Sequence, residues 1–339
     1  MTAEILNERN KQGEWRPEGA IVQAPINDWP PRPMATLKWL FGFPGFIWPE
    51  NIFWVGVAVF TWVFLTPDLA TMQTLEIWWV ALLYARNFAF ILLLFGGMHW
   101  YLYMRRGQGD HLQYNTKSFA TDSRRFVFKN QVRDNMFHTL FYGVPVMTAY
   151  EVITYWAFAN GYLGFFDFGG DPVLFWSYFV FLLFLAPFVH GAHFYFAHRL
   201  LHTKLMYKHF HSLHHNNVEV GPWSGLSMHP VEHILYFSTV VVQWLIALHP
   251  VNALFQIQIA AFYPAPGHCG FEKMNVWKDI GFASGSHFHY MHHQYFECNY
   301  GGSLAPLDKW FGTFHDGTPE SLTRMREQMK VRRKANAAT

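Results

Sequence analysis

Residues 173–202 read VLFWSYFVFLLFLAPFVHGAHFYFAHRLLH. The first seventeen of them, 173–189, carry no charged side chain, and seventeen apolar residues are enough for a short membrane-spanning helix. The stretch then continues without a break into His190, His193 and the group His198-Arg-Leu-Leu-His202. It therefore predicts a transmembrane helix whose last turns bring histidines to a site just beyond the membrane boundary.

Sixteen of the twenty histidines lie between His190 and His293. Eight of these sixteen fall into three groups, here called boxes 1 to 3: His198-Arg-Leu-Leu-His202, His211-Ser-Leu-His214-His215 and His289-Tyr-Met-His292-His293. Side chains three and four residues apart share one face of a helix, so each box would direct its imidazoles to one place. Hydrogen-bonded core histidines or a histidine-rich loop would be the ordinary alternative for one such group. Three repeated groups favour a site for a pair of metal ions.

The composition indicates a membrane protein with a sizeable part outside the bilayer. The chain of 339 residues is 51% hydrophobic and only 14% charged, against about a quarter in soluble domains. Its net charge of +2 gives no support to a nucleic-acid partner. Two cysteines, Cys269 and Cys298, exclude a disulfide framework and make cysteine-ligated zinc or iron–sulfur clusters poor candidates.

Three more apolar stretches are expected to cross the membrane: 52–65, 77–103 and 138–158. The first has fourteen residues, so it needs residues 46–48 to span, or it is a buried helix instead. Arg86 in the second stretch is expected near an interface or paired, with Glu151 of the third stretch as the candidate partner. The connection at 104–137 carries seven Lys and Arg, whereas those at 66–76 and 159–172 carry none. The positive-inside rule then puts the N-terminus, the C-terminus and the boxes on the cytoplasmic side.

The expected fold is an all-α integral membrane protein with about four transmembrane helices and a cytosolic, helical, histidine-rich cap that holds a di-metal site. Two apolar arms separated by His249-Pro250 are too short to span, so they would dip into one leaflet or pack on the core. We expect residues 1–46 to form a cytosolic N-terminal segment and residues 47–195 the transmembrane helices. Residues 196–317 would form the catalytic cap, with a short membrane-dipping hairpin at 234–263, and residues 318–339 a charged tail.

The three boxes resemble those of the fatty acid hydroxylase / sterol desaturase superfamily. The arginine after His198, the Met228-His229-Pro230 segment, His268-Cys269-Gly270 and the closing Pro306-Leu-Asp-Lys-Trp-Phe-Gly-Thr313 are also similar, over about residues 190–315. The resemblance implies a membrane-embedded di-metal oxygenase. Carried over residue by residue, the metal ligands are His198, His202, His211, His214, His215, His268, His289, His292 and His293.

Glu272 departs from the family pattern, because the fatty acid hydroxylase branch has a histidine four residues after the position of His268. Three alternatives stay open: Glu272 ligates a metal, supports a ligand, or is replaced by His229 or His233. Asp308 and Glu232 are candidate hydrogen-bond acceptors for ligand N–H groups.

The function expected from the boxes is a membrane-bound, non-haem di-iron oxygenase that hydroxylates or desaturates a sterol-like or fatty acyl lipid with dioxygen. An all-imidazole site suits iron or zinc, but oxidising an unactivated C–H bond requires a redox-active metal. We therefore expect two iron ions, which zinc can displace. Electrons would come from a separate ferredoxin or b-type cytochrome with its reductase, since the sequence lacks a dinucleotide fingerprint. The alternative is a zinc-dependent membrane hydrolase or a metal-binding membrane protein without oxidative activity.

Overall fold

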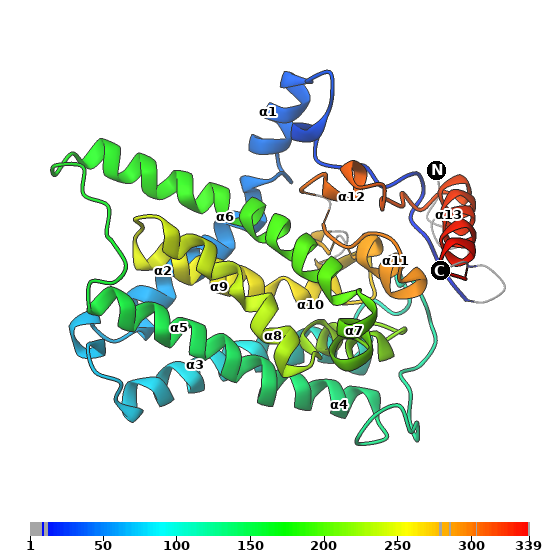
Figure 1. The fold of residues 1–339 in the computed structure, drawn as a ribbon, viewed down its shortest axis with the longest axis horizontal. Coiled ribbons are helices and arrows are strands. Elements are labelled where there is room, and N and C mark those ends of the chain that lie inside the picture. The colour runs from blue at the N-terminus through cyan, green and yellow to red at the C-terminus, as the bar shows by residue number, and fades with distance from the viewer. Residues whose placement is uncertain (1–8, 10–12, 278–279, 285, 303, 338–339) are drawn as a thin grey trace.

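The computed structural model describes residues 9, 13–277, 280–284, 286–302 and 304–337. These residues are mostly helical, as expected. The long helices α3 (Ile77–His99), α5 (Val144–Ala159), α6 (Pro172–Leu201) and α9 (Pro250–Phe262) run lengthwise across Figure 1. The short helices α7 (Lys204–Met206), α11 (His287–Tyr295) and α12 (Leu307–Trp310) gather at one end of the molecule, together with the longer α13 (Pro319–Ala337).

The remaining elements connect these helices. They are α1 (Pro33–Phe41), α2 (Ile52–Leu65), α4 (Gln131–His138), α8 (Pro230–Phe237) and α10 (Pro264–Gly267). Among the described residues, the one sheet is an antiparallel pair of β1 (Lys273–Trp277) and β2 (Ile280–Ala283), in which Met274 faces Phe282.

Three helices in the described part of the chain are long and apolar enough to cross a membrane: Ile47–Leu65, Ile77–Met104 and Pro172–Leu201. The first joins α2 to the preceding turn, Ile47–Asn51, which supplies the length that residues 52–65 lack. The fourth expected span corresponds to α5, which is shorter and carries Glu151, and α5 is not among the three. The chain is thus a membrane protein with three candidate spans, and a count of four stays a prediction.

Helix α9 lies at the centre of the helical core. All thirteen of its residues are buried, and it packs against α2, α5 and α6. It is the second arm of the hairpin expected at 234–263; the first arm comprises α8 and the 3-10 turns Ser238–Leu245. An apolar helix enclosed on all sides needs no lipid contact, so its burial favours the alternative in which this arm packs on the core.

Arg86 of α3 and Glu151 of α5 form a buried ion pair, which is one of the alternatives that the sequence left open. Arg86 Nη2 donates to Glu151 Oε1, and Asn87 Nδ2 donates to Glu151 Oε2 over 2.8 Å. The other guanidinium nitrogen, Nη1, reaches the Leu65 carbonyl at 3.2 Å and Thr66 Oγ1 at 3.1 Å. The pair therefore ties α3 to α5 and to the end of α2.

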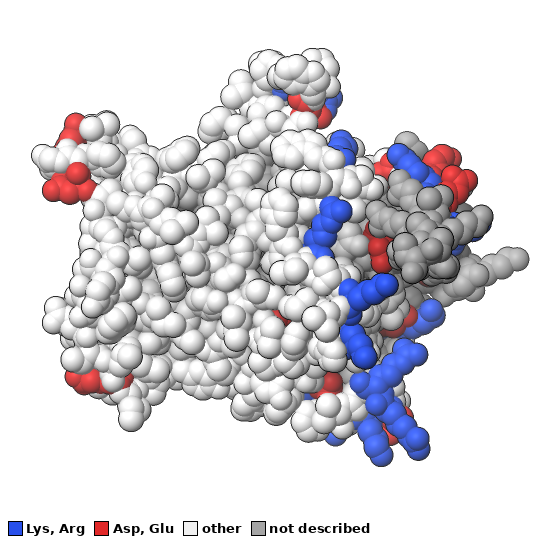
Figure 2. All heavy atoms as spheres, viewed as in Figure 1, with Lys and Arg blue, Asp and Glu red and all other residues white. Residues whose placement is uncertain are grey.

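Charged side chains are distributed unevenly over the surface. On the face drawn in Figure 2, Lys and Arg gather at the end that carries the short helices, and the broad middle shows almost none. The opposite end shows a few Asp and Glu. A wide apolar band between charged ends is the surface expected of a protein that spans a bilayer.

Candidate metal centre

Box 1 is held by the end of the longest helix. Asp171 caps α6, accepting hydrogen bonds from the backbone N–H of Val173 at 2.8 Å and Leu174 at 3.2 Å, and Pro172 follows at the first helical position. The helix then runs through the apolar stretch to Leu201. His198 therefore lies on its last turn and His202 directly after it, one turn apart on the same face.

Boxes 2 and 3 lie on short helical segments at the same end of the molecule. A π-helical turn, Tyr207–His211, and a 3-10 turn, His214–Asn216, carry box 2. Helix α11 carries box 3, and His268 follows the end of α10. The structure thereby brings together all nine histidines named as ligands by the resemblance.

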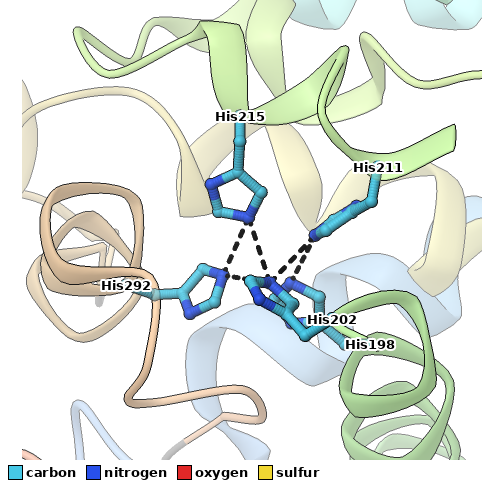
Figure 3. A group of neighbouring side chains, drawn as sticks. All are labelled: His198, His202, His211, His215 and His292. Atoms are coloured by element: carbon cyan, nitrogen blue, oxygen red, sulfur yellow. Dashed lines mark hydrogen bonds between the residues drawn. The ribbon is translucent and has the colours of Figure 1, made fainter. Parts of the chain in front are cut away.

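The nine side chains form two groups rather than three. The first group takes five histidines from all three boxes: His198, His202, His211, His215 and His292. Their ligand atoms all lie within 4.8 Å of one another, and Figure 3 shows the rings pointing to a common centre. Neighbouring Nε2 atoms, such as those of His202 and His292, are 3.1 Å apart.

The second group contains His214, His268, His289 and His293. Its Nε2 atoms are separated by 3.0 Å between His289 and His268, 3.2 Å between His293 and His268, and 3.4 Å between His268 and His214. The two groups are adjacent, because the rings of His215 and His293 lie 4.8 Å apart, centroid to centroid. The site thus has two neighbouring centres, one with five imidazoles and one with four.

Hydrogen bonds at the opposite ring nitrogen fix the tautomer of several of these histidines. Because a carbonyl oxygen only accepts, each Nδ1 that faces one must carry the proton. The acceptor is the Tyr300 carbonyl for His198 at 2.6 Å, the Cys298 carbonyl for His292 at 2.6 Å, and the Pro264 carbonyl for His268 at 3.0 Å. The Nε2 atom of each ring therefore presents a lone pair to the centre of its group.

Lone pairs that face one another cannot hydrogen bond, so the geometry suits a cation at each centre. A metal ion about 2.1 Å from each imidazole nitrogen requires about 3.0 Å between neighbouring nitrogens in octahedral geometry and about 3.4 Å in tetrahedral geometry. The Nε2 separations of 3.0–3.4 Å match this range. A donor set of imidazoles alone fits iron, zinc or copper better than magnesium or calcium.

Burial keeps these imidazoles neutral. It lowers the pKa of His268 from 6.5 to about 4. It also lowers, well below 6.5, the pKa values of the other histidines of both groups that lie outside the spans: His202, His211, His214, His215, His289, His292 and His293. Neighbouring imidazoles add to the effect in each of these seven, since a second positive charge nearby disfavours protonation. Neutral imidazole is the form that binds metals.

Three of the additional candidates lie outside both groups. His229 caps α8, where its Nδ1 accepts from the Val231 N–H at 3.2 Å. His233 is fully buried against Gly143. Glu272 accepts a hydrogen bond from Tyr114 Oη at 2.6 Å. None of the three belongs to either group of neighbouring ligand atoms.

The two carboxylates expected beside the ligands act differently. Glu232 Oε1 accepts directly from Nδ1 of His211 at 2.7 Å. Asp308 binds no histidine; its carboxylate accepts from the backbone N–H groups of Tyr300 at 2.9 Å and Gly301 at 2.8 Å. Since the Tyr300 carbonyl accepts from His198, Asp308 supports that ligand through the backbone rather than by contact.

Sequence reasoning missed the carbonyl groups that orient the rings, those of Tyr300, Cys298 and Pro264. No residue type marks a carbonyl acceptor, so the sequence held no signal for them. It also missed Glu50, which lines the cavity beside the site. An acidic residue at the start of an apolar stretch was the available signal.

A cavity of about 290 Å³ opens onto both groups. Its lining includes His198 and His211 of the first group and His214, His268 and His289 of the second. Most of the remaining lining is apolar, including Phe194, Met228 and Phe288. Such a cavity suits an apolar molecule whose reacting carbon approaches the two centres.

A candidate membrane-spanning helix that ends at box 1, beside two neighbouring all-histidine groups, is the arrangement that the resemblance of the boxes implies. Residues 179–313 match the family model described as fatty acid hydroxylase. Over this region, about two fifths of its length, the chain is similar to members of the fatty acid hydroxylase / sterol desaturase superfamily. No solved structure matches the chain.

Individual relatives show the same similarity. A putative methylsterol monooxygenase of Dictyostelium discoideum is 33% identical over 40% of this chain and 51% of its own length. A Delta(7)-sterol 5(6)-desaturase of Gibberella zeae is 29% identical over 40% of this chain and 42% of its own. A cholesterol 25-hydroxylase-like protein of Danio rerio is 29% identical over 36% of this chain and 51% of its own length. The chain thus spans about half the length of the curated relatives it matches.

Proposed function

We propose that this protein is a membrane-bound, non-haem di-iron oxygenase that hydroxylates or desaturates a lipid. The observation that carries the proposal is the pair of adjacent all-imidazole groups at one end of a mostly apolar cavity. The proposed ligands are the five histidines of the first group and the four of the second, nine in all.

Bound iron would supply the redox chemistry that activates dioxygen and oxidises an unactivated C–H bond. Hydroxylation converts R–H, O₂, two electrons and two protons into R–OH and water. Desaturation uses the same oxidant and electrons, removes two hydrogens and releases two waters. The two outcomes differ in the carbon atoms placed next to the irons, and the relatives' names include both a monooxygenase and a desaturase.

The residues of the chain hold and shield the centre. Four ligand rings are fixed with the Nε2 lone pair inward, because Nδ1 donates a hydrogen bond on the other side. The pairs are His211 with Glu232, His198 with the Tyr300 carbonyl, His292 with the Cys298 carbonyl and His268 with the Pro264 carbonyl. Phe194, Met228 and Phe288 exclude water from the approach, which limits the loss of oxidant to solvent.

A separate ferredoxin or b-type cytochrome with its reductase is the proposed electron donor. We place the N-terminus, the C-terminus and the boxes on the cytoplasmic side. The positive-inside rule supports this orientation, since Lys and Arg gather at the end that carries the boxes (Figure 2).

The test is metal content and Mössbauer spectroscopy of the detergent-purified full chain grown with iron-57, followed by a lipid-product screen with and without dioxygen. About two irons per chain and products that require dioxygen are expected. Zinc that iron reconstitution cannot replace, or products that form equally without dioxygen, would favour the zinc hydrolase instead. An intact, folded preparation that binds no metal would overturn the di-metal site.

A further inference from the structure

The cavity beside the metal centre follows one face of α6 for much of that helix. Its lining takes Pro187, His190, Phe194, His198 and Leu201 from α6, which are spaced by three or four residues and so share one face. The fourteen steps of about 1.5 Å from Pro187 to Leu201 give a length of about 21 Å along the helix. The cavity is therefore elongated, with the histidine groups toward the Leu201 end.

Glu50 lies at the other end of this cavity. It belongs to the turn Ile47–Asn51, which directly precedes α2. Phe46, four residues earlier in the chain, packs against Phe184 and Phe188 of α6 at ring-centroid distances of 5.4 and 5.3 Å. These contacts place the turn beside Pro187, about three helical turns from His198.

Glu50 also lines a second cavity, of about 200 Å³, between two candidate membrane spans. This cavity takes Phe53 and Trp54 from α2, and Leu94 and Met98 from α3. Among the described residues of its lining, Glu50 is the only charged one. The two cavities share Glu50, Pro266 and Ser284, so Glu50 stands at the junction between a lipid-facing pocket and the route to the metal centre.

The Glu50 carboxylate has capacity to accept a hydrogen bond from a bound molecule. None of the ion pairs between described residues involves it. Nearby hydroxyl groups donate elsewhere: Tyr263 Oη to Asn51 Oδ1 at 2.8 Å, and Ser284 Oγ to the Phe271 carbonyl. A carboxylate offers about four lone-pair positions, so one neighbouring donor, the Trp54 side chain, leaves most of them open.

We propose that Glu50 is a specificity-determining residue that binds a hydroxyl group of the lipid substrate, at the end remote from the carbon that reacts. The proposal rests on the proposed function and narrows its substrate to hydroxyl-bearing lipids. The apolar body of the lipid would extend from Glu50 along α6 to the histidine groups. Access would be lateral, from the bilayer between α2 and α3.

The chemistry of Glu50 distinguishes among lipid classes. A neutral hydroxyl donates a charge-assisted hydrogen bond to a carboxylate without bringing a second charge into the cavity. An ionised fatty acid would place two carboxylates side by side, and like charges at short range repel strongly in an apolar site. The geometry therefore favours a lipid alcohol, such as a sterol-like ring or a long-chain alcohol, over a free fatty acid.

The test is equilibrium binding to the detergent-purified, iron-loaded full chain, without electron donor or dioxygen so that no turnover occurs. The probes are cholesterol against its 3-O-methyl ether, 1-octadecanol against 1-methoxyoctadecane, and stearate. We expect wild type to prefer an alcohol over its matched ether by about tenfold or more. Glu50→Leu should lose that preference, keep its affinity for the ether, and bind stearate more tightly than wild type.

Glu76→Leu is the matched control, because Glu76 is an exposed carboxylate next to the first turn of α3; it should keep the wild-type preference. A wild-type protein that binds neither alcohol better than its ether, or a Glu50→Leu variant that keeps the preference, would overturn the proposal. Iron content is measured on the same samples. Either of these two overturning results in samples that retain two irons contradicts only the role of Glu50, whereas absent iron contradicts the proposed function.

Discussion

Nδ1 of His211 donates a hydrogen bond to Oε1 of Glu232 over 2.7 Å, and the two side chains are only 1% and 2% exposed. The bond fixes the ring with Nε2 toward the other four histidines of the first group. A carboxylate behind a ligating imidazole also raises its basicity.

Replacing Glu232 should therefore weaken metal binding at the first group. We expect Glu232→Ala to reduce metal affinity or activity by about 10- to 100-fold. Glu232→Gln keeps an acceptor oxygen and should lose less. Metal titration of the purified variants measures both, and full wild-type affinity in Glu232→Ala would show that the contact does not orient His211.

Asp308 is expected to support His198 from a distance. Its carboxylate accepts two backbone N–H groups and the Thr313 hydroxyl at 2.6 Å. Asp308→Ala leaves buried donors unsatisfied, at a cost of about 1–3 kcal/mol each, and should lower both thermal stability and metal content. Thr313→Val removes only the side-chain bond and serves as the milder control. Wild-type stability and metal content in Asp308→Ala would contradict the indirect role.

The ion pair between Arg86 and Glu151 provides a test of the helical core. Removing one partner strands a buried charge, so Arg86→Met and Glu151→Leu should each destabilise the protein by about 3–5 kcal/mol. The double variant leaves no charge stranded and should recover much of that loss. Thermal denaturation in one detergent measures the cycle; single variants as stable as wild type would mean that water or lipid headgroups compensate the charge.

The spacing of the histidines was enough to predict that the three boxes converge, and the resemblance added His268, but neither predicted how the nine divide. Box 2 gives His211 and His215 to the first group and His214 to the second, while box 3 gives His292 to the first and His289 and His293 to the second. Helical periodicity places neighbours on a face. The division between centres depends on how α6, α11 and the box 2 turns pack, which spacing within one segment does not encode.

The fold was predictable where a single segment carries the signal. Hydropathy located three spans, and the cost of a buried charge made Glu151 a candidate partner of Arg86. Helix α5 stays a predicted fourth span: residues 138–158 are largely apolar, while its buried Glu151 and Thr148 bind Asn87 of α3. Hydropathy alone does not separate a lipid-facing helix from one buried in protein.

His233 should make stability depend on pH. Burial, with smaller contributions from His138 and His229, lowers the pKa of His233 from 6.5 to about 3. Between these values the unfolded chain binds a proton that the folded chain does not, so stability falls as pH drops below 6.5, by up to about 1.4 kcal/mol per pH unit. His233→Leu should lose less stability than wild type between pH 7 and pH 5. Thermal denaturation at each pH measures this loss. If the stability of the two proteins fell by the same amount between pH 7 and pH 5, the result would contradict a titrating His233.

The two groups should lose metal independently when single ligands are removed. Because His292 belongs to the five-histidine group and His214 to the four-histidine group, His292→Ala should mainly empty the first centre and His214→Ala the second. Each variant should retain about one iron per chain, and its Mössbauer spectrum should show one iron environment in place of two. His209→Ala is the matched control, because His209 lies beside box 2 but outside both groups, and it should retain two irons. Loss of both irons from either variant would mean that the centres are coupled and that neither binds iron alone. Retention of both in His292→Ala and in His214→Ala would contradict the assignment of these residues as ligands.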